Sequence, residues 1–144
     1  MHSVRPFLPL FGRILLSAIF IVDGILQLSD AGGTARYFAK VHVPVPDFAV
    51  WISVAIHLLG GLAVLFGFRA KWAASILAFF CLATAFGVHL PAGDMGNMIH
   101  FLKNLAIAGG FVYVVAFGAG PISVDGRTAA TLIGQGEYRG SVRD

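Results

Sequence analysis

Four long apolar stretches constrain the fold of this chain more than any other feature of its sequence. They cover about residues 11–28, 48–68, 72–90 and 98–117, and each approaches the roughly 20 residues that an α-helix needs to cross a bilayer. Only helices and closed barrels satisfy the backbone within lipid, and these stretches lack the strand alternation of a barrel. The sequence therefore predicts an all-α integral membrane protein, a four-helix bundle.

The composition agrees with a membrane-embedded chain. Of its 144 residues, 58% are hydrophobic and 12% are charged, whereas an average soluble domain is about 45–50% apolar and about 25% charged. The basic residues are scattered rather than clustered, which argues against nucleic acid as a partner and leaves the lipid bilayer. The single cysteine, Cys81, excludes an internal disulfide. We predict one membrane domain over residues 1–120 and a cytoplasmic tail of mixed order over residues 121–144.

The loops and their charges predict an orientation. The short segment "RAK" at residues 69–71 joins the second and third spans in a tight hairpin, and four spans place both termini on one side. The cations near the span ends on that side are Arg5, Arg13, Arg69, Lys71 and Arg127, against Arg36, Lys40 and Lys103 on the other. The positive-inside rule then predicts that both termini are cytoplasmic. Arg13 is expected to extend its side chain to the cytoplasmic headgroups.

The stretch "IHFLKNLAIAGG" places Lys103 and Asn104 inside an apolar run. Asp23, in the first span, has a similar predicted depth, about 7 to 8 Å from the outer end at 1.5 Å per residue. Opposite charges at one depth predict an Asp23–Lys103 pair. Three roles are open for these groups: a structural ion pair, a site for a ligand, proton or substrate, or a lysine that extends to the outer surface.

Other polar residues lie at helical spacing beside small residues. Lys103 shares a face with Gly110, and His57 shares one with Ser53 and the glycine pair that follows. His57 is either a packed polar contact or a proton-responsive group. The predicted polar pocket, which opens outward, is formed by Asp23, Gln27, His57, Lys103, Asn104, His89 and His100.

No sequence pattern identifies a metal site or a catalytic residue. No two of the histidines and Cys81 combine i, i+4 spacing with a common depth, so we predict no metal. Nucleophile elbows, P-loops and dinucleotide fingerprints are absent from the sequence. We therefore assign no catalytic residue.

Four segments, in order, resemble the DoxX family of small four-helix membrane proteins. They are "GRILLSAIFIVDGILQL", "TARYFAKVHVPVP", "HLLGGLAVLFGFRAKWAA" and "FLKNLAIAGGFVYVVAFGAGPISVD". The most specific parts are the FLKN block before a glycine pair and the ending G-x-G-P-x-S-x-D. The resemblance implies a four-helix bundle in the bacterial inner membrane and no well-defined active site.

The resemblance also implies a link to redox chemistry, because relatives are associated with quinone-dependent oxidoreductase systems or with membrane complexes of oxidative-stress defence. Two departures stand out. Many relatives carry a glutamate before the paired glycines of the second helix, where this chain has His57. The first helix of relatives often carries "SGLxK", where this chain has "DGILQ" with Asp23 and Gln27. Relative to the pattern that the resemblance implies, the acidic charge lies on the first helix instead of the second.

These observations favour a redox-associated membrane subunit that contacts a quinone, the one cofactor the sequence suggests. Lysine, asparagine and histidine side chains can hydrogen-bond quinone carbonyl oxygens, and a reducible ring needs proton donors nearby. Other membrane or redox subunits are then expected partners. The alternative is a non-enzymatic structural or assembly subunit of a larger complex, because small-residue faces also pack against other helices. A small-solute carrier is less favoured, since the spans lack the breaks of transporter helices.

Overall fold

The computed structural model describes residues 6–141, and the side chains of residues 6–132. The described part contains helices and no strand. Four of its segments are long and apolar enough to cross a membrane: Phe7–Ser29, Pro46–Phe66, Ala70–Ala92 and Met95–Phe117. Each agrees with a predicted span to within a few residues, which confirms the all-α membrane bundle. Arg5, one of the predicted inner cations, lies outside the described residues.

The first and fourth spans are regular α-helices, α1 (Phe7–Ser29) and α7 (Met95–Phe117). The middle spans each contain one five-residue π-helical turn. The second span is made of α3 (Pro46–Ala55), η1 (Ile56–Gly60) and α4 (Gly61–Phe66). The third is made of α5 (Ala70–Thr84), η2 (Ala85–His89) and α6 (Leu90–Ala92). Such π turns widen a helix locally and are frequent at functional sites.

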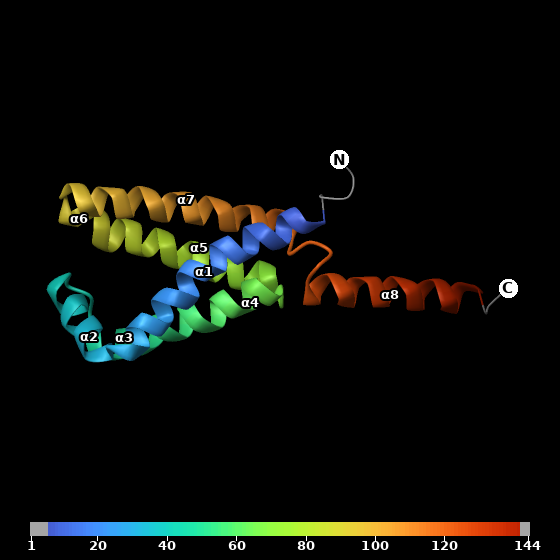
Figure 1. The fold of residues 1–144 in the computed structure, drawn as a ribbon, viewed down its shortest axis with the longest axis horizontal. Coiled ribbons are helices and arrows are strands. Elements are labelled where there is room, and N and C mark those ends of the chain that lie inside the picture. Colours follow the sequence, from blue (N-terminus) through green and yellow to red (C-terminus); the bar gives the residue numbers. More distant parts are fainter. Residues whose placement is uncertain (1–5, 142–144) are drawn as a thin grey trace.

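Small side chains fill the interface between the spans. Figure 1 shows α5 and α7 side by side along their length, with α1 running diagonally across the bundle toward α3. Leu77 and Phe111 are fully buried there among Ala74, Ala78 and Ala108. Close approach over small residues is typical of membrane helices, because lipid provides no hydrophobic force that drives helices together.

Two further helices lie outside the four spans. The connection after the first span contains α2 (Ala31–Lys40), whose first turn is capped by the Asp30 carboxylate accepting from the backbone N–H of Gly33 at 2.8 Å. The tail predicted to be of mixed order contains α8 (Val124–Ser141). Figure 1 shows α2 at one end of the bundle and α8 projecting beyond the other.

Another carboxylate caps the fourth span. Asp94 accepts a hydrogen bond from the backbone N–H of Asn97 at 3.0 Å and one from its side-chain amide at 2.6 Å. The backbone bond, followed by the side-chain bond, holds the pKa of Asp94 below its usual value. The charged carboxylate thus satisfies an N–H group that has no partner within the helix.

Arg13 is buried, so the prediction that it reaches the headgroups is wrong. Its side chain is 1% exposed, and its guanidinium donates to the carbonyl oxygens of Val64 at 3.1 Å, Leu65 at 3.0 Å and Ile122 at 2.5 Å. The last carbonyls of a helix lack intrahelical partners and carry the negative end of its dipole. The end of α4 is therefore a better environment for this cation than the bundle surface.

Asp125 completes this closure at the end of the bundle where α4 meets α5. Its carboxylate accepts from the backbone N–H groups of Arg69 and Ala70, each at 2.8 Å, and so caps the start of α5. Its own backbone N–H donates to the Gly67 carbonyl at 2.9 Å. The ending G-x-G-P-x-S-x-D thus fastens the segment after α7 onto the hairpin between the middle spans.

Candidate functional site

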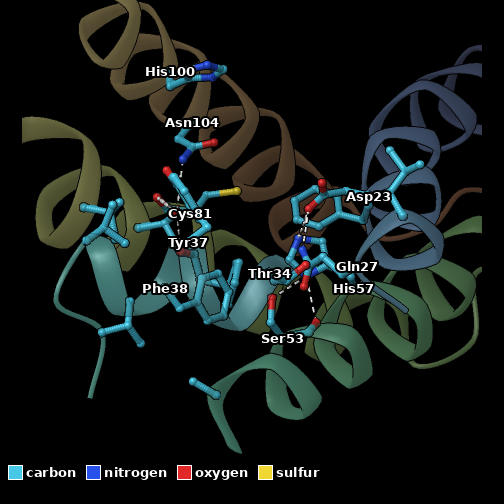
Figure 2. A pocket seen from close by; sticks show the side chains of 18 of the residues that line it. Asp23, Gln27, Thr34, Tyr37, Phe38, Ser53, His57, Cys81, His100 and Asn104 are labelled. Atoms are coloured by element: carbon cyan, nitrogen blue, oxygen red, sulfur yellow. Dashed lines mark hydrogen bonds and ion pairs between the residues drawn. The ribbon is translucent and has the colours of Figure 1, made fainter. Parts of the chain in front are cut away.

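A cavity of about 760 Å³ lies between the spans at the end of the bundle where α2 packs (Figure 2). Apolar side chains such as Ile19, Phe38 and Ile107 form much of its wall. All seven residues of the predicted polar pocket line it: Asp23, Gln27, His57, His89, His100, Lys103 and Asn104. The chain therefore brings together polar side chains from four spans around one space.

The centre of this site is a pair formed by Asp23 and His57. Asp23 Oδ2 lies 3.1 Å from His57 Nε2, and it also accepts a hydrogen bond from Gln27 Nε2 at 2.7 Å. Figure 2 shows the two side chains pointing toward each other from α1 and η1. The His57 side chain is 7% exposed, whereas that of Asp23 is 51% exposed. The buried imidazole therefore holds a carboxylate that remains open to the cavity.

The hydrogen-bond partners of the two His57 ring nitrogens indicate how many protons the pair holds. His57 Nδ1 lies 2.7 Å from the carbonyl oxygen of Ser53, which can only accept, so Nδ1 carries a hydrogen. The contact between Nε2 and Asp23 Oδ2 then needs one further proton, bound either to the imidazole or to the carboxyl. Both forms are net neutral as a pair, which suits a site inside a membrane.

Aromatic rings fix the orientation of His57. The ring of Phe80 meets the imidazole edge to face at a centroid distance of 4.9 Å, and Phe20 lies at 5.3 Å on another side. These contacts, with the Ser53 hydrogen bond, leave one ring nitrogen to face Asp23. The imidazole is therefore preorganised toward the carboxylate.

Glycines bring the helix of Asp23 close enough to reach His57. A Cβ at Gly24 would lie 2.8 Å from Leu58 Cδ2 and 3.0 Å from His57 Cβ, so only glycine fits at this crossing. A Cβ at Gly61 would meet Ile21 at 3.0 Å, while one at Gly60 would meet Leu77 at 3.0 Å. The glycine pair after His57 therefore serves two neighbours, α1 on one side and α5 on the other.

Lys103 does not pair with Asp23, so this prediction is wrong. The one ion pair among the described side chains joins Asp23 to His57. Lys103 Nζ instead donates to His100 Nδ1 at 3.2 Å, one turn away on α7. A common depth brought Asp23 and Lys103 to the same cavity, but the rotation of each helix decides which side chains touch. Both residues line the same cavity, Asp23 from α1 and Lys103 from α7.

The histidines nearer the end of the bundle form a second polar group. The rings of His89 and His100 stack at a centroid distance of 5.3 Å, and His89 Nδ1 lies 2.9 Å from Asn97 Oδ1. His89 belongs to the π turn η2, which brings its ring to α7. Together with Lys103, these rings line the cavity.

Sequence patterns did not identify some residues of this site. Thr84 accepts a hydrogen bond from Asn104 Nδ2 at 3.0 Å, and its single hydroxyl gives no signal in an apolar helix. Tyr37 also lines the cavity, from α2. Its position follows from α2, the helix that forms between the first two spans.

Much of this chain matches a known protein family. The family model named DoxX matches residues 8–90, which include Asp23, His57 and both π turns. The chain belongs to the DoxX family. It is 36% identical over 116 residues to the inner membrane protein YqjF of Escherichia coli, covering 81% of this chain and 88% of that one. It is 35% identical over 130 residues to the inner membrane protein YphA of the same organism, covering 87% and 93%.

A more distant relative carries a functional name. The Bacillus subtilis protein named "Putative oxidoreductase CatD" is 29% identical over 85 residues, covering 59% of this chain and 62% of that protein. No solved structure matches the chain significantly. The two inner membrane relatives and the four apolar spans identify this DoxX protein as a multi-pass protein of the inner membrane.

Proposed function

We propose that this DoxX protein is an accessory subunit of a membrane redox system and binds a quinone-type ring in its cavity. The observation that carries the proposal is the combination of an apolar wall with polar groups from separate spans inside the membrane-spanning bundle. Small-molecule sites have this character: a mostly apolar lining with a few converging polar groups.

The polar groups suit the oxygen atoms of a quinone. Lys103 Nζ donates one hydrogen to His100, and its two other hydrogens can be donated to a ring oxygen. The Asn104 amide donates one hydrogen to Thr84, and its second hydrogen can be donated to a ligand. Aliphatic and aromatic side chains, including Ile107 and Phe38, provide apolar contact for the ring and its tail. A charged donor contributes more to such binding than a neutral one.

Proton supply is the second requirement of quinone chemistry, because reduction of the ring consumes protons as well as electrons. The Asp23–His57 pair holds one proton between two groups of different chemistry, and its carboxylate is open to the cavity. A positioned acid–base pair of this kind serves proton transfer. The oxidoreductase name of the Bacillus subtilis relative supports a redox setting.

Equilibrium binding tests this proposal. Purified protein in detergent micelles is titrated with a short-tailed quinone and followed by calorimetry and by the melting temperature. We expect saturable binding that stabilises the protein, and an affinity about tenfold lower in Lys103→Met, because a charge-assisted hydrogen bond is lost. Lys71→Met, the same change at the other end of the bundle, is the matched control and should bind like wild type.

Two outcomes would contradict the proposal: no saturable binding to the wild-type protein, or equal loss of affinity in Lys103→Met and Lys71→Met. Recovery of partner subunits from native membranes, together with an absence of quinone binding, would favour an assembly subunit instead.

A further inference from the structure

One oxygen of the Asp23 carboxylate accepts no hydrogen bond from the described side chains. Both contacts of the Asp23 carboxylate fall on Oδ2, which receives Gln27 Nε2 at 2.7 Å and faces His57 Nε2 at 3.1 Å. Oδ1 is left for the cavity, on a side chain that is 51% exposed. A carboxylate oxygen in such a place needs a donor from a ligand or from water.

Oδ1 accepts in either form of the pair. When the shared proton is on His57, Asp23 is a carboxylate and both its oxygens accept. When the proton is on Asp23, it lies on Oδ2, where Nε2 receives it, and Oδ1 is the carbonyl oxygen of the acid. Movement of the proton along the pair therefore does not turn Oδ1 into a donor.

Another helix that lines the cavity offers donors. Lys103 on α7 lines the same cavity and keeps two ammonium hydrogens after its contact with His100. The two walls therefore differ in polarity, with an acceptor on α1 and a cationic donor on α7. The Asp23 and Lys103 side chains form no ion pair or hydrogen bond with each other, so a molecule between them can contact both.

A quinone and a quinol differ in how they meet these walls. Both oxygens of a quinone are acceptors, so one can receive Lys103 while the other, if it approaches Asp23 Oδ1, sets acceptor against acceptor. A quinol hydroxyl donates through its hydrogen and accepts through its oxygen. It can donate to Oδ1 from one end of the ring and accept from Lys103 at the other.

We propose that the cavity selects the reduced, hydroxyl-bearing ring, a quinol, over the corresponding quinone, and that Asp23 determines this specificity. The inference rests on the proposed function, which holds that the cavity binds a ring of this class. Sites built around a buried hydrogen bond discriminate strongly against analogues that leave a polar group unpaired. We expect the quinol to bind at least about tenfold more tightly than the quinone.

Three ligands of nearly the same ring test the inference on the wild-type protein. They are trimethylhydroquinone, its quinone and its dimethyl ether, which keeps the ring oxygens and removes both hydroxyl hydrogens. Titrations are made by calorimetry in detergent micelles without oxygen, with the quinol kept reduced. The quinol should bind most tightly, and the ether should lose the advantage because it cannot donate to Oδ1.

A substitution then locates the effect. Asp23→Asn can present an amide hydrogen in place of an oxygen, so the preference for the quinol should fall to about equality or reverse toward the quinone. Asp47→Asn, at an exposed position that does not line the cavity, is the matched control and should keep the wild-type preference. Circular dichroism and size-exclusion chromatography confirm that each variant is folded. If Asp23→Asn does not fold, the three-ligand series on the wild-type protein decides alone.

The outcomes separate this inference from the proposed function. Equal or tighter binding of the quinone overturns the quinol preference and leaves the quinone-type site standing. A quinol preference that survives in a folded Asp23→Asn overturns the role of Asp23. Failure of all three ligands to bind overturns the inference and the proposed function together.

Discussion

Asp23 on α1 and His57 in η1 contact each other, with Oδ2 lying 3.1 Å from Nε2. The imidazole is held by Ser53 and by two aromatic rings, and the carboxylate faces the cavity. This pair takes the place of the predicted Asp23–Lys103 pair. It also joins the acidic residue of the first span to the histidine of the second.

A double-mutant cycle tests which cation pairs with Asp23. Asp23→Asn and His57→Gln should each lower the free energy of unfolding, and the double variant should lose about 1 kcal/mol less than the sum, because the two changes remove the same interaction. Asp23→Asn combined with Lys103→Met should instead be additive. Unfolding in mixed micelles with a denaturing detergent gives these energies. Coupling to Lys103 and none to His57 would contradict the assigned pair.

Arg13 is expected to stabilise the closed end of the bundle strongly. Arg13→Met leaves the carbonyls of Val64, Leu65 and Ile122 without this donor, and should cost about 3 kcal/mol or more. Arg13→Lys should recover only part of this, since one ammonium cannot reproduce the planar fork of a guanidinium. Arg36→Met, on the exposed side of α2, is the matched control and should cost little. Equal melting temperatures for the Arg13 and Arg36 variants would refute the role of Arg13.

Gly67 should tolerate no side chain. It ends α4 at φ +67°, and a Cβ there would clash with Ser123 and the Arg13 guanidinium. Gly67→Ala should therefore lower stability by about 2 kcal/mol or more. Gly109, where a Cβ meets nothing within 4 Å, provides the contrast. Gly109→Ala should be neutral or stabilising by up to about 1 kcal/mol, because alanine favours the helix. Comparable losses at both glycines in a melting experiment would argue against this account.

The spans could be predicted from sequence because bilayer thickness sets their length and hydrocarbon sets their composition. The members of the cavity could be predicted as well, since few polar residues occur within the spans and they cluster toward one end. What could not be predicted is which of them touch. Depth follows from position along a helix, whereas contact depends on helix rotation and crossing, as Lys103 shows.

The π turns and the burial of Arg13 could not be predicted from the sequence, for different reasons. A π turn changes the rotation of the residues that follow it, and neither "IHLLG" nor "AFGVH" carries a pattern that marks one. For Arg13, proximity to a span end favours extension toward headgroups, but the acceptors that bury it come from residues 51 or more positions away in the chain. Long-range carbonyl partners are not visible in a local pattern.

The orientation of the bundle stays a prediction that reporter fusions can check. Green fluorescent protein fused after the C-terminus should fluoresce, and alkaline phosphatase at the same position should be inactive, because we expect that end in the cytoplasm. Insertion of the two reporters after Lys40, in the connection that follows α2, should give the opposite pattern. Active phosphatase at the C-terminus would reverse the assigned direction.

Photolabelling tests the central claim, that a quinone-type ring occupies the cavity, most directly. A short-tailed quinone bearing an aryl azide is irradiated with the purified protein, and labelled peptides are identified by mass spectrometry. We predict labels on peptides around Asp23, His57 and Lys103, which excess unlabelled quinone should suppress. Label confined to lipid-facing positions such as Trp72 and Phe79, or label that excess quinone does not reduce, would contradict the account.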